Sequence, residues 1–338
     1  MKVKKLNIII IFIALMAIIG YVGITDFHNM RNIIHKVNFI WILGTLLLMV
    51  LYWFLETLIL YLVTKKVHNK QKFNETLQTT MIGQFFNCIT PFSSGGQPMQ
   101  AVHMAKLGVP FGIASSCLLI KFIIYQVVLT LYALVVLCLK IGEFSAKVEG
   151  FTYMVMIGFI VNVVVVFVLL SIGWFKKITI KVVFKIINFL EKIKLIKKKE
   201  QKKVYIIKEF DSFYKSFRWM KSHKKIIFYM AILSAMQLTV YFLVPYFIYR
   251  SFGLQGSMLS IISAQAFVLM ISSFIPLPGA VGGAEVSFFA FFKLFFPANL
   301  LNISVLLWRI ITFYLTICIG MCFTLWQKEE RINITKKA

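Results

Sequence analysis

The chain has 338 residues, of which 60% are hydrophobic and 14% charged, with a mean hydropathy of +0.85. Soluble domains average about 45–50% apolar and about 25% charged residues, so this composition excludes an ordinary soluble protein and predicts a single integral membrane domain over residues 1–338. The formal net charge is +25. The five cysteines all lie in apolar stretches without ligand spacing, so we expect no metal site, no disulfide framework and no cofactor.

A membrane-spanning helix needs about 20 mostly apolar residues. The stretches that meet this length are, in chain order, 6–24, 39–63, 113–139, 152–174, 226–249 and 302–326. The first follows three lysines and looks like a signal peptide, but it lacks a small-x-small cleavage site, so we interpret it as a retained span.

The orientation follows from the basic residues near the ends of the spans. Lysines cluster between the second span and residue 72, and residues 175–226 hold seventeen Lys and Arg against four Asp and Glu. The alternate connections carry little charge. This pattern predicts a multi-pass membrane protein with both termini in the cytoplasm.

Two further apolar segments, 77–108 and 258–297, are interrupted by glycine and proline at 90–98 and 276–283. Each half is too short to span the membrane. We therefore predict two re-entrant helical hairpins, the first from the cytoplasm and the second from outside. Irregular backbone at membrane depth is tolerated only inside protein or beside a water-filled cavity, so the interruptions should line a polar cavity.

The two halves of the chain show the same order of elements with opposite orientation, as in the inverted repeats of transporters. Pro91-x3-Gly95-Gly96 matches Pro278-x3-Gly282-Gly283, and a basic residue follows 25 or 26 positions later. The fold class we predict is all-α, with about six spans, two hairpins and a possible 3+3 inverted repeat. Coincidence in a glycine-containing membrane protein is the alternative.

Charged residues near mid-membrane cost about 2.5–3.5 kcal/mol and usually face the interior of a bundle. Four stand out, and the pairs expected are Glu56 with Lys121 and Glu285 with Arg309. They either orient helices, or Lys121 and Arg309 contact a lipid phosphate, to which Arg binds bidentately and Lys as a point charge. The helix N-termini after Gly96 and Gly283 would add backbone N–H groups suited to an anion.

Neutral polar residues of the first interruption add hydrogen-bonding groups. They either contact the substrate or satisfy freed backbone groups, whereas Gln126 is typical of contacts between helices. The candidate residues for lipid binding and translocation are Glu56, Ser93, Ser94, Gly95, Gly96, Gln97, Lys121, Pro278, Gly282, Gly283, Glu285 and Arg309.

The segment 175–225 mixes lysines with Ile, Phe and Val at helical spacing. This pattern predicts an amphipathic cytoplasmic helix on the anionic inner leaflet. Nucleic acid is a rival partner for such a basic run, but direct continuity with spans on both sides favours the membrane.

Two stretches, "GQFFNCITPFSSGGQPMQA" (83–101) and "SSFIPLPGAVGGAEVSFFAFF" (272–292), resemble the lysylphosphatidylglycerol synthase transmembrane-region family, also called UPF0104, and the resemblance covers essentially the whole chain. It implies a polytopic domain of the bacterial inner membrane. In the multiple peptide resistance factor, this domain moves lysyl-phosphatidylglycerol between leaflets. The soluble acyltransferase-like domain of that enzyme has no counterpart in the dozen residues after the last span.

The function expected is translocation of an anionic or aminoacylated phospholipid, or of a polyprenyl-phosphate lipid. Phosphatidylglycerol lysyltransferase activity and a membrane partner of a separate synthase are the alternatives. No nucleophile set or phosphate loop supports an enzyme. The partners expected are anionic membrane phospholipids, with a synthase subunit or a second copy of the chain also open.

Overall fold

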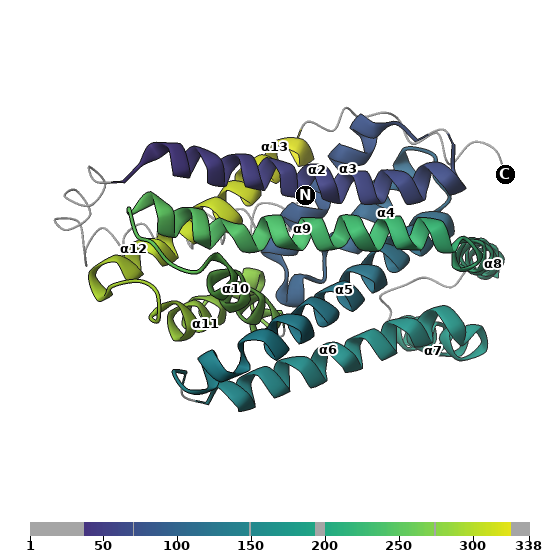
Figure 1. The fold of residues 1–338 in the computed structure, drawn as a ribbon. Coiled ribbons are helices and arrows are strands. Elements are labelled where there is room, and N and C mark those ends of the chain that lie inside the picture. The colour runs from purple at the N-terminus through teal and green to yellow at the C-terminus, as the bar shows by residue number, and fades with distance from the viewer. Residues whose placement is uncertain (1–36, 70, 149, 193–199, 274, 326–338) are drawn as a thin grey trace.

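The computed structural model describes residues 37–69, 71–148, 150–192, 200–273 and 275–325, and the regular elements in these ranges are all helices. Their bounds are α2 Phe39–Val67, α3 Phe73–Ile89, η1 Pro91–Ser93, α4 Gly96–Lys106, α5 Phe111–Ser145, α6 Phe151–Trp174, α7 Lys176–Lys192, α8 Glu200–Ser222, α9 Lys224–Ser251, α10 Met258–Ser272, η2 Pro278–Ala280, α11 Gly283–Phe292, α12 Ala298–Arg309, η3 Ile310–Tyr314 and α13 Leu315–Leu325. Figure 1 shows their arrangement.

Five helices of the described ranges are long and apolar enough to cross a membrane. They are α2, α5, α6, α9 and the run from α12 to α13, and they confirm the spans predicted at 39–63, 113–139, 152–174, 226–249 and 302–326. At 1.5 Å per residue the 29 residues of α2 measure about 43 Å, more than the roughly 30 Å of hydrocarbon. The predicted span 6–24 lies outside the described residues.

Helices α2 and α9 run antiparallel and define the two ends of the bundle (Figure 1). The Asn38 amide, at the start of α2, donates to the carbonyl of Ser251, the last residue of α9, over 2.8 Å. At the other end α2 finishes with Lys65 and Lys66, near the start of α9. We call this the basic end and the first the opposite end.

The two interrupted segments form helical hairpins that enter the bundle from different ends. The α3–α4 hairpin follows the last turn of α2 and leads into α5, whose Gly112 amide donates to Glu209 of α8 at the basic end. The α10–α11 hairpin starts just after α9 at the opposite end. There Ser260 of α10 donates to Glu143 near the end of α5 over 3.0 Å.

The tips of the hairpins, η1 and η2, lie against each other. They also share a backbone conformation. Each begins with proline, and two left-handed residues follow, with φ of 55° and 51° at Phe92 and Ser93 and 60° and 52° at Gly279 and Ala280. Left-handed Phe and Ser are uncommon, because their Cβ atoms crowd the carbonyl oxygen. The shared geometry and opposite directions of the hairpins support the predicted inverted repeat.

The buried apolar residues gather in two clusters. One cluster surrounds α10 and α11 and includes the mutually packed rings of Phe144, Phe151, Phe267 and Phe291. The other surrounds α4 and the first half of α5. Large apolar side chains on the outside of α2 and α6 remain exposed, as expected of helices that face lipid.

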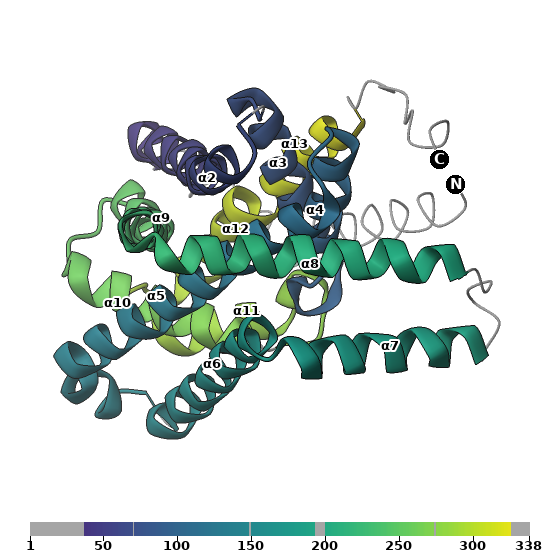
Figure 2. The same ribbon diagram turned by 90° about the vertical axis from the view of Figure 1, so that its right-hand side faces the viewer.

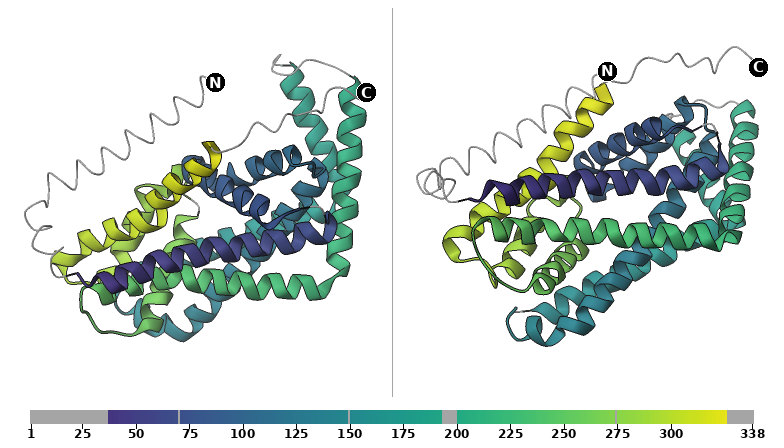
Figure 3. Two further views of the ribbon diagram at one scale, coloured as in Figure 1. Left: turned by 90° about the horizontal axis from the view of Figure 1, so that it is seen from above. Right: turned by 45° about the horizontal axis from the view of Figure 1, so that its top comes forward.

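The basic segment 175–225 forms the two helices α7 and α8, which run crosswise to α2 and α9 at the basic end (Figures 2 and 3). An ion pair of 2.7 Å between Lys176 Nζ and Asp211 Oδ1 joins the two helices. The Tyr214 hydroxyl donates to the Ile172 carbonyl over 2.9 Å and fixes α8 to the end of α6. Described lysines of α7, such as Lys181 and Lys185, are exposed.

Candidate functional site

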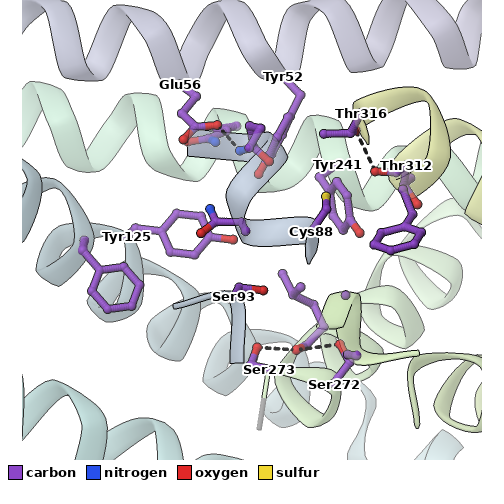
Figure 4. Close-up of a pocket in the computed structure, with 18 of the residues that line it drawn as sticks. Tyr52, Glu56, Cys88, Ser93, Tyr125, Tyr241, Ser272, Ser273, Thr312 and Thr316 are labelled. Carbon is purple, nitrogen blue, oxygen red and sulfur yellow. Dashed lines mark hydrogen bonds between the residues drawn. The ribbon is translucent and has the colours of Figure 1, made fainter. Parts of the chain in front are cut away.

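A cavity of about 300 Å³ lies where the hairpin tips meet. Its walls come from α2, α3, α4, α5, α9, α10, α11, η1, η2 and the α12–α13 run, so both hairpins contribute to it. Figure 4 shows Tyr52, Glu56, Ser93, Tyr125, Tyr241 and Thr312 around this space. The prediction that the interruptions line a polar cavity is confirmed for Ser93 and Gln97 of the first and for Gly279 and Ala280 of the second.

The first predicted charge pair is confirmed. Lys121 Nζ of α5 lies 2.7 Å from Glu56 Oε1 of α2, and both side chains are nearly buried. The second carboxylate oxygen of Glu56 accepts a hydrogen bond from Gln84 Nε2 of α3. Glu56 therefore joins two helices and the first hairpin at the wall of the cavity.

The second predicted pair is confirmed as well. Arg309 Nε lies 2.8 Å from Glu285 Oε1, an ion pair by distance. The other guanidinium nitrogens donate to the carbonyls of Gly279 and Ala280 over 3.2 and 3.4 Å. Arg309 thus holds the tip of the second hairpin while it also faces the cavity.

A π-helical turn, η3, follows Arg309 directly and places Thr312 and Phe313 in the cavity wall. Such single π-turns inside α-helices occur frequently at functional sites. The Phe313 ring packs against the tip of the second hairpin, where a Cβ on Gly279 would lie 2.0 Å from Phe313 Cε2. This close approach explains a glycine at that position.

The other predicted site residues build the hairpin tips without lining the cavity. Ser94, Gly95, Gly96, Pro278, Gly282, Gly283 and Glu285 belong to this group. Two amides at the starts of these helices are already engaged: Gly96 N–H, the first of α4, donates to Asn87 Oδ1 over 3.0 Å, and Gly282 N–H, just before α11, donates to Glu285 Oε2 over 2.7 Å. The anion contact expected at the amides after Gly96 and Gly283 stays a prediction.

Most of the polar lining is neutral, and apart from Ser93, Gln97 and Gln126 it comes from residues that the sequence analysis did not name. The neutral side chains of the cavity wall that are able to donate or accept hydrogen bonds include Tyr52, Gln84, Asn87, Ser93, Gln97, Gln100, Tyr125, Gln126, Ser234, Gln237, Tyr241, Gln265, Ser272, Ser273, Trp308, Thr312 and Thr316. Gln126 lies in this wall, although we expected only a contact between helices. The common signal is a polar residue in the middle of an apolar helix, which also fits interhelical packing.

The chain matches the family model of the lysylphosphatidylglycerol synthase transmembrane region over residues 7–320. It is also similar to a UPF0104 membrane protein of Archaeoglobus fulgidus, at 28% identity over 299 residues that cover 86% of this chain and 87% of the relative. The matched span includes both hairpins and both charge pairs. The chain therefore belongs to the lysylphosphatidylglycerol synthase transmembrane-region family.

Proposed function

We propose that this membrane protein translocates a phospholipid between leaflets by passing its headgroup through the cavity between the hairpins. The observation that carries the proposal is the position of the polar cavity. It lies where the tips of hairpins from opposite ends meet, and residues of both apolar clusters contribute to its wall. Transporters with inverted repeats place the substrate site in this way.

The exposure of the tips supports a lateral route for the lipid. The residues of the first tip, Pro91 to Ser94, are exposed, and so is Leu277 of the second hairpin. Irregular backbone in the hydrocarbon region requires a polar, protected environment. A headgroup that enters beside the tips would occupy that environment while the acyl chains stay in the membrane.

The substrates that we propose are anionic or aminoacylated phospholipids such as lysyl-phosphatidylglycerol, and polyprenyl-phosphate lipids. Lys121 and Arg309 line the cavity and are the cations among its described residues. Each already has a carboxylate partner, so a lipid phosphate would share or displace that partner. We also propose that the basic end faces the cytoplasm of a bacterial cell, because basic flanks stay inside.

The proposal is tested with the purified chain in proteoliposomes that contain fluorescent, tail-labelled phosphatidylglycerol. Addition of membrane-impermeant dithionite bleaches the outer leaflet, and we expect the protected half of the signal to fall as the protein moves lipid outward. Protein-free vesicles and vesicles with an unrelated helical membrane protein give the baseline. A bleached fraction that stays at half would refute translocation.

Lipid extraction from cells that express only this chain separates the alternatives. Newly formed lysyl-lipid would mean lysyltransferase activity, and a chain that neither moves nor makes lipid would fit a partner of a synthase. The expected result is translocation without new lysyl-lipid.

A further inference from the structure

The tips of the two hairpins are held by different contacts, although they occupy equivalent places in the inverted repeat. At the second tip, Arg309 of α12 donates to the carbonyls of Gly279 and Ala280 over 3.2 and 3.4 Å. Arg309 also pairs with Glu285, and the Phe313 ring of η3 packs against the same tip. The second tip is therefore fixed to the α12–α13 run, which is long enough to cross a membrane.

The counterpart of Arg309 in the first half of the chain is Lys121, which follows the glycine pair of its hairpin by 25 residues, against 26 for Arg309. The Lys121 ammonium group donates to Glu56 Oε1 over 2.7 Å, and this partner lies on α2, outside the hairpin. Arg309 pairs instead with Glu285, a residue of the hairpin that it holds. The two basic residues thus have equivalent positions and different partners, since one ties α5 to α2 and the other ties α12 to a hairpin tip.

The hydrogen bonds of the first tip lie within its own hairpin, in the part of the chain that the structure describes. The Gly95 amide donates to Thr90 Oγ1 over 2.8 Å, and the Gly96 amide donates to Asn87 Oδ1 over 3.0 Å. These bonds join the start of α4 to the end of α3 and make the tip a firm unit. Residues 91–94 are exposed. The first tip can therefore move as a unit without losing a hydrogen bond to another described helix.

Backbone strain also differs between the tips. Phe92 and Ser93 of the first tip adopt the left-handed conformation, with φ of 55° and 51°. This conformation costs free energy and persists only where the surroundings impose it. At the second tip one of the two corresponding residues is Gly279, which adopts it without steric cost. The first tip thus combines more strain with hydrogen bonds that stay inside its own hairpin, so less free energy opposes its movement.

We propose that the first tip, residues 90–96, is the moving gate of the cavity and that the second tip is the fixed wall against which it closes. The two tips lie against each other, so the gate is closed in this conformation. Ser93 of the first tip and Gly279 of the second both line the cavity, and separation of the tips would admit a headgroup between them. Arg309 is a positioning residue that keeps the wall in place. This inference rests on the proposed function and adds which of the two hairpins moves.

The experiment measures amide hydrogen exchange of the full chain in detergent micelles by mass spectrometry. The two tips offer equivalent amides for comparison. Ser93 and Ser94 donate to the carbonyls three residues before them over 3.2 and 3.1 Å, and Ala280 and Val281 do the same over 2.9 and 3.3 Å. Because these local bonds match, a difference in exchange reports how often each tip opens.

We expect the amides of the first tip to exchange about tenfold faster than those of the second. The reason is the Arg309 contact, since a hydrogen bond to a charged group shifts an equilibrium by about this factor or more. Equal rates at the two tips, or faster exchange at the second tip, would overturn the proposal.

Two variants test whether Arg309 causes the difference. Arg309→Lys keeps a positive charge beside Glu285 but lacks the planar fork that reaches two carbonyls, so exchange at the second tip should rise to the rate of the first. Phe313→Leu removes the ring packed on Gly279 and should raise it as well, even if Arg309→Lys fails to fold. The matched control is Lys121→Met, which should leave exchange at the first tip unchanged. An unchanged second tip in both variants, or a first tip accelerated as much by the control, would overturn the asymmetry.

Addition of phosphatidylglycerol to the micelles tests the link between the gate and the lipid. A headgroup held in the cavity should slow exchange at the first tip severalfold and leave the second tip unchanged. A response of the second tip, or no response of the first, would overturn the gate. Translocation measured in proteoliposomes with the same preparation separates the two proposals: lipid movement without a response of the first tip leaves only the proposed function, and a response without lipid movement leaves only the gate.

Discussion

Replacement of Glu56 by Gln removes the partner of a nearly buried ammonium group. The pair joins α2 to α5 over 2.7 Å, and the side chains of Lys121 and Glu56 are 13% and 8% exposed. At an effective dielectric constant of 20, charges at this distance attract by about 6 kcal/mol. The new amide still accepts a hydrogen bond from Lys121, worth about 1.5–3 kcal/mol. The net loss is therefore about 3–4.5 kcal/mol, within the range of broken buried pairs.

The measurement is the free energy of unfolding in mixed detergent micelles, followed by circular dichroism as SDS is added. Glu56→Gln and Lys121→Met should each lose about 3 kcal/mol. The double variant should be more stable than either single variant, because no unpaired charge remains. The matched control is Asp211→Asn, which breaks a pair of the same length, 2.7 Å, whose side chains are 45% and 59% exposed. An exposed pair is worth about 0–1 kcal/mol.

A loss below 1 kcal/mol in Glu56→Gln, equal to that of the control, would refute this reasoning. It would mean that water reaches the pair freely and that the wall of the cavity is open at α5. A double variant less stable than both single variants would show that the two residues do not act as a pair.

Three further predictions concern the second hairpin and the crosswise helices. Arg309→Gln should abolish lipid translocation per inserted molecule in the dithionite assay while membrane insertion stays intact; full activity would count against a role in the cavity. Gly279→Ala should lower the melting temperature, because its φ is 60° and the new Cβ would meet an aromatic ring. The matched control is Gly142→Ala, which should raise the melting temperature because Gly142 lies in a helix with open space around it. A change of the melting temperature in the same direction in both variants would refute the explanation given for Gly279. Hydrogen exchange of α7 should be slower in anionic than in zwitterionic nanodiscs, since each lysine near an anionic surface contributes about 1 kcal/mol to binding. The double variant Lys181→Glu with Lys185→Glu should abolish this difference. An unchanged difference would disprove binding of α7 to that surface.

The sequence located the hairpins because proline and glycine interrupt segments that are otherwise apolar but too short to span. It also identified both charge pairs. Charges at membrane depth are rare, so four of them leave few ways to pair. Glu56 and Lys121 lie at similar distances from the cytoplasmic ends of their spans, which was enough to pair them, and the structure confirms the contact.

The neutral lining of the cavity was largely missed. Gln265 lies in α10, which is apolar on all sides, so no periodic pattern distinguishes the face that meets the cavity. Gln237 lies in the apolar middle of α9, and Trp308 lies near the end of α12. Buried amides of this kind usually join neighbouring helices. Their unpaired atoms become visible only when the surrounding side chains are in place.

The sequence by itself determined which segments cross the membrane, which enter and return, and which charges need a partner, because these properties depend on local hydropathy, chain breaks and the cost of charge in hydrocarbon. Only the tertiary structure decided that the tips of the two hairpins meet with the same left-handed backbone, that Arg309 holds the carbonyls of the second tip, and which neutral groups face the cavity. These features depend on how helices distant in the sequence rotate and pack against one another, and the local pattern of an all-apolar helix does not specify that rotation.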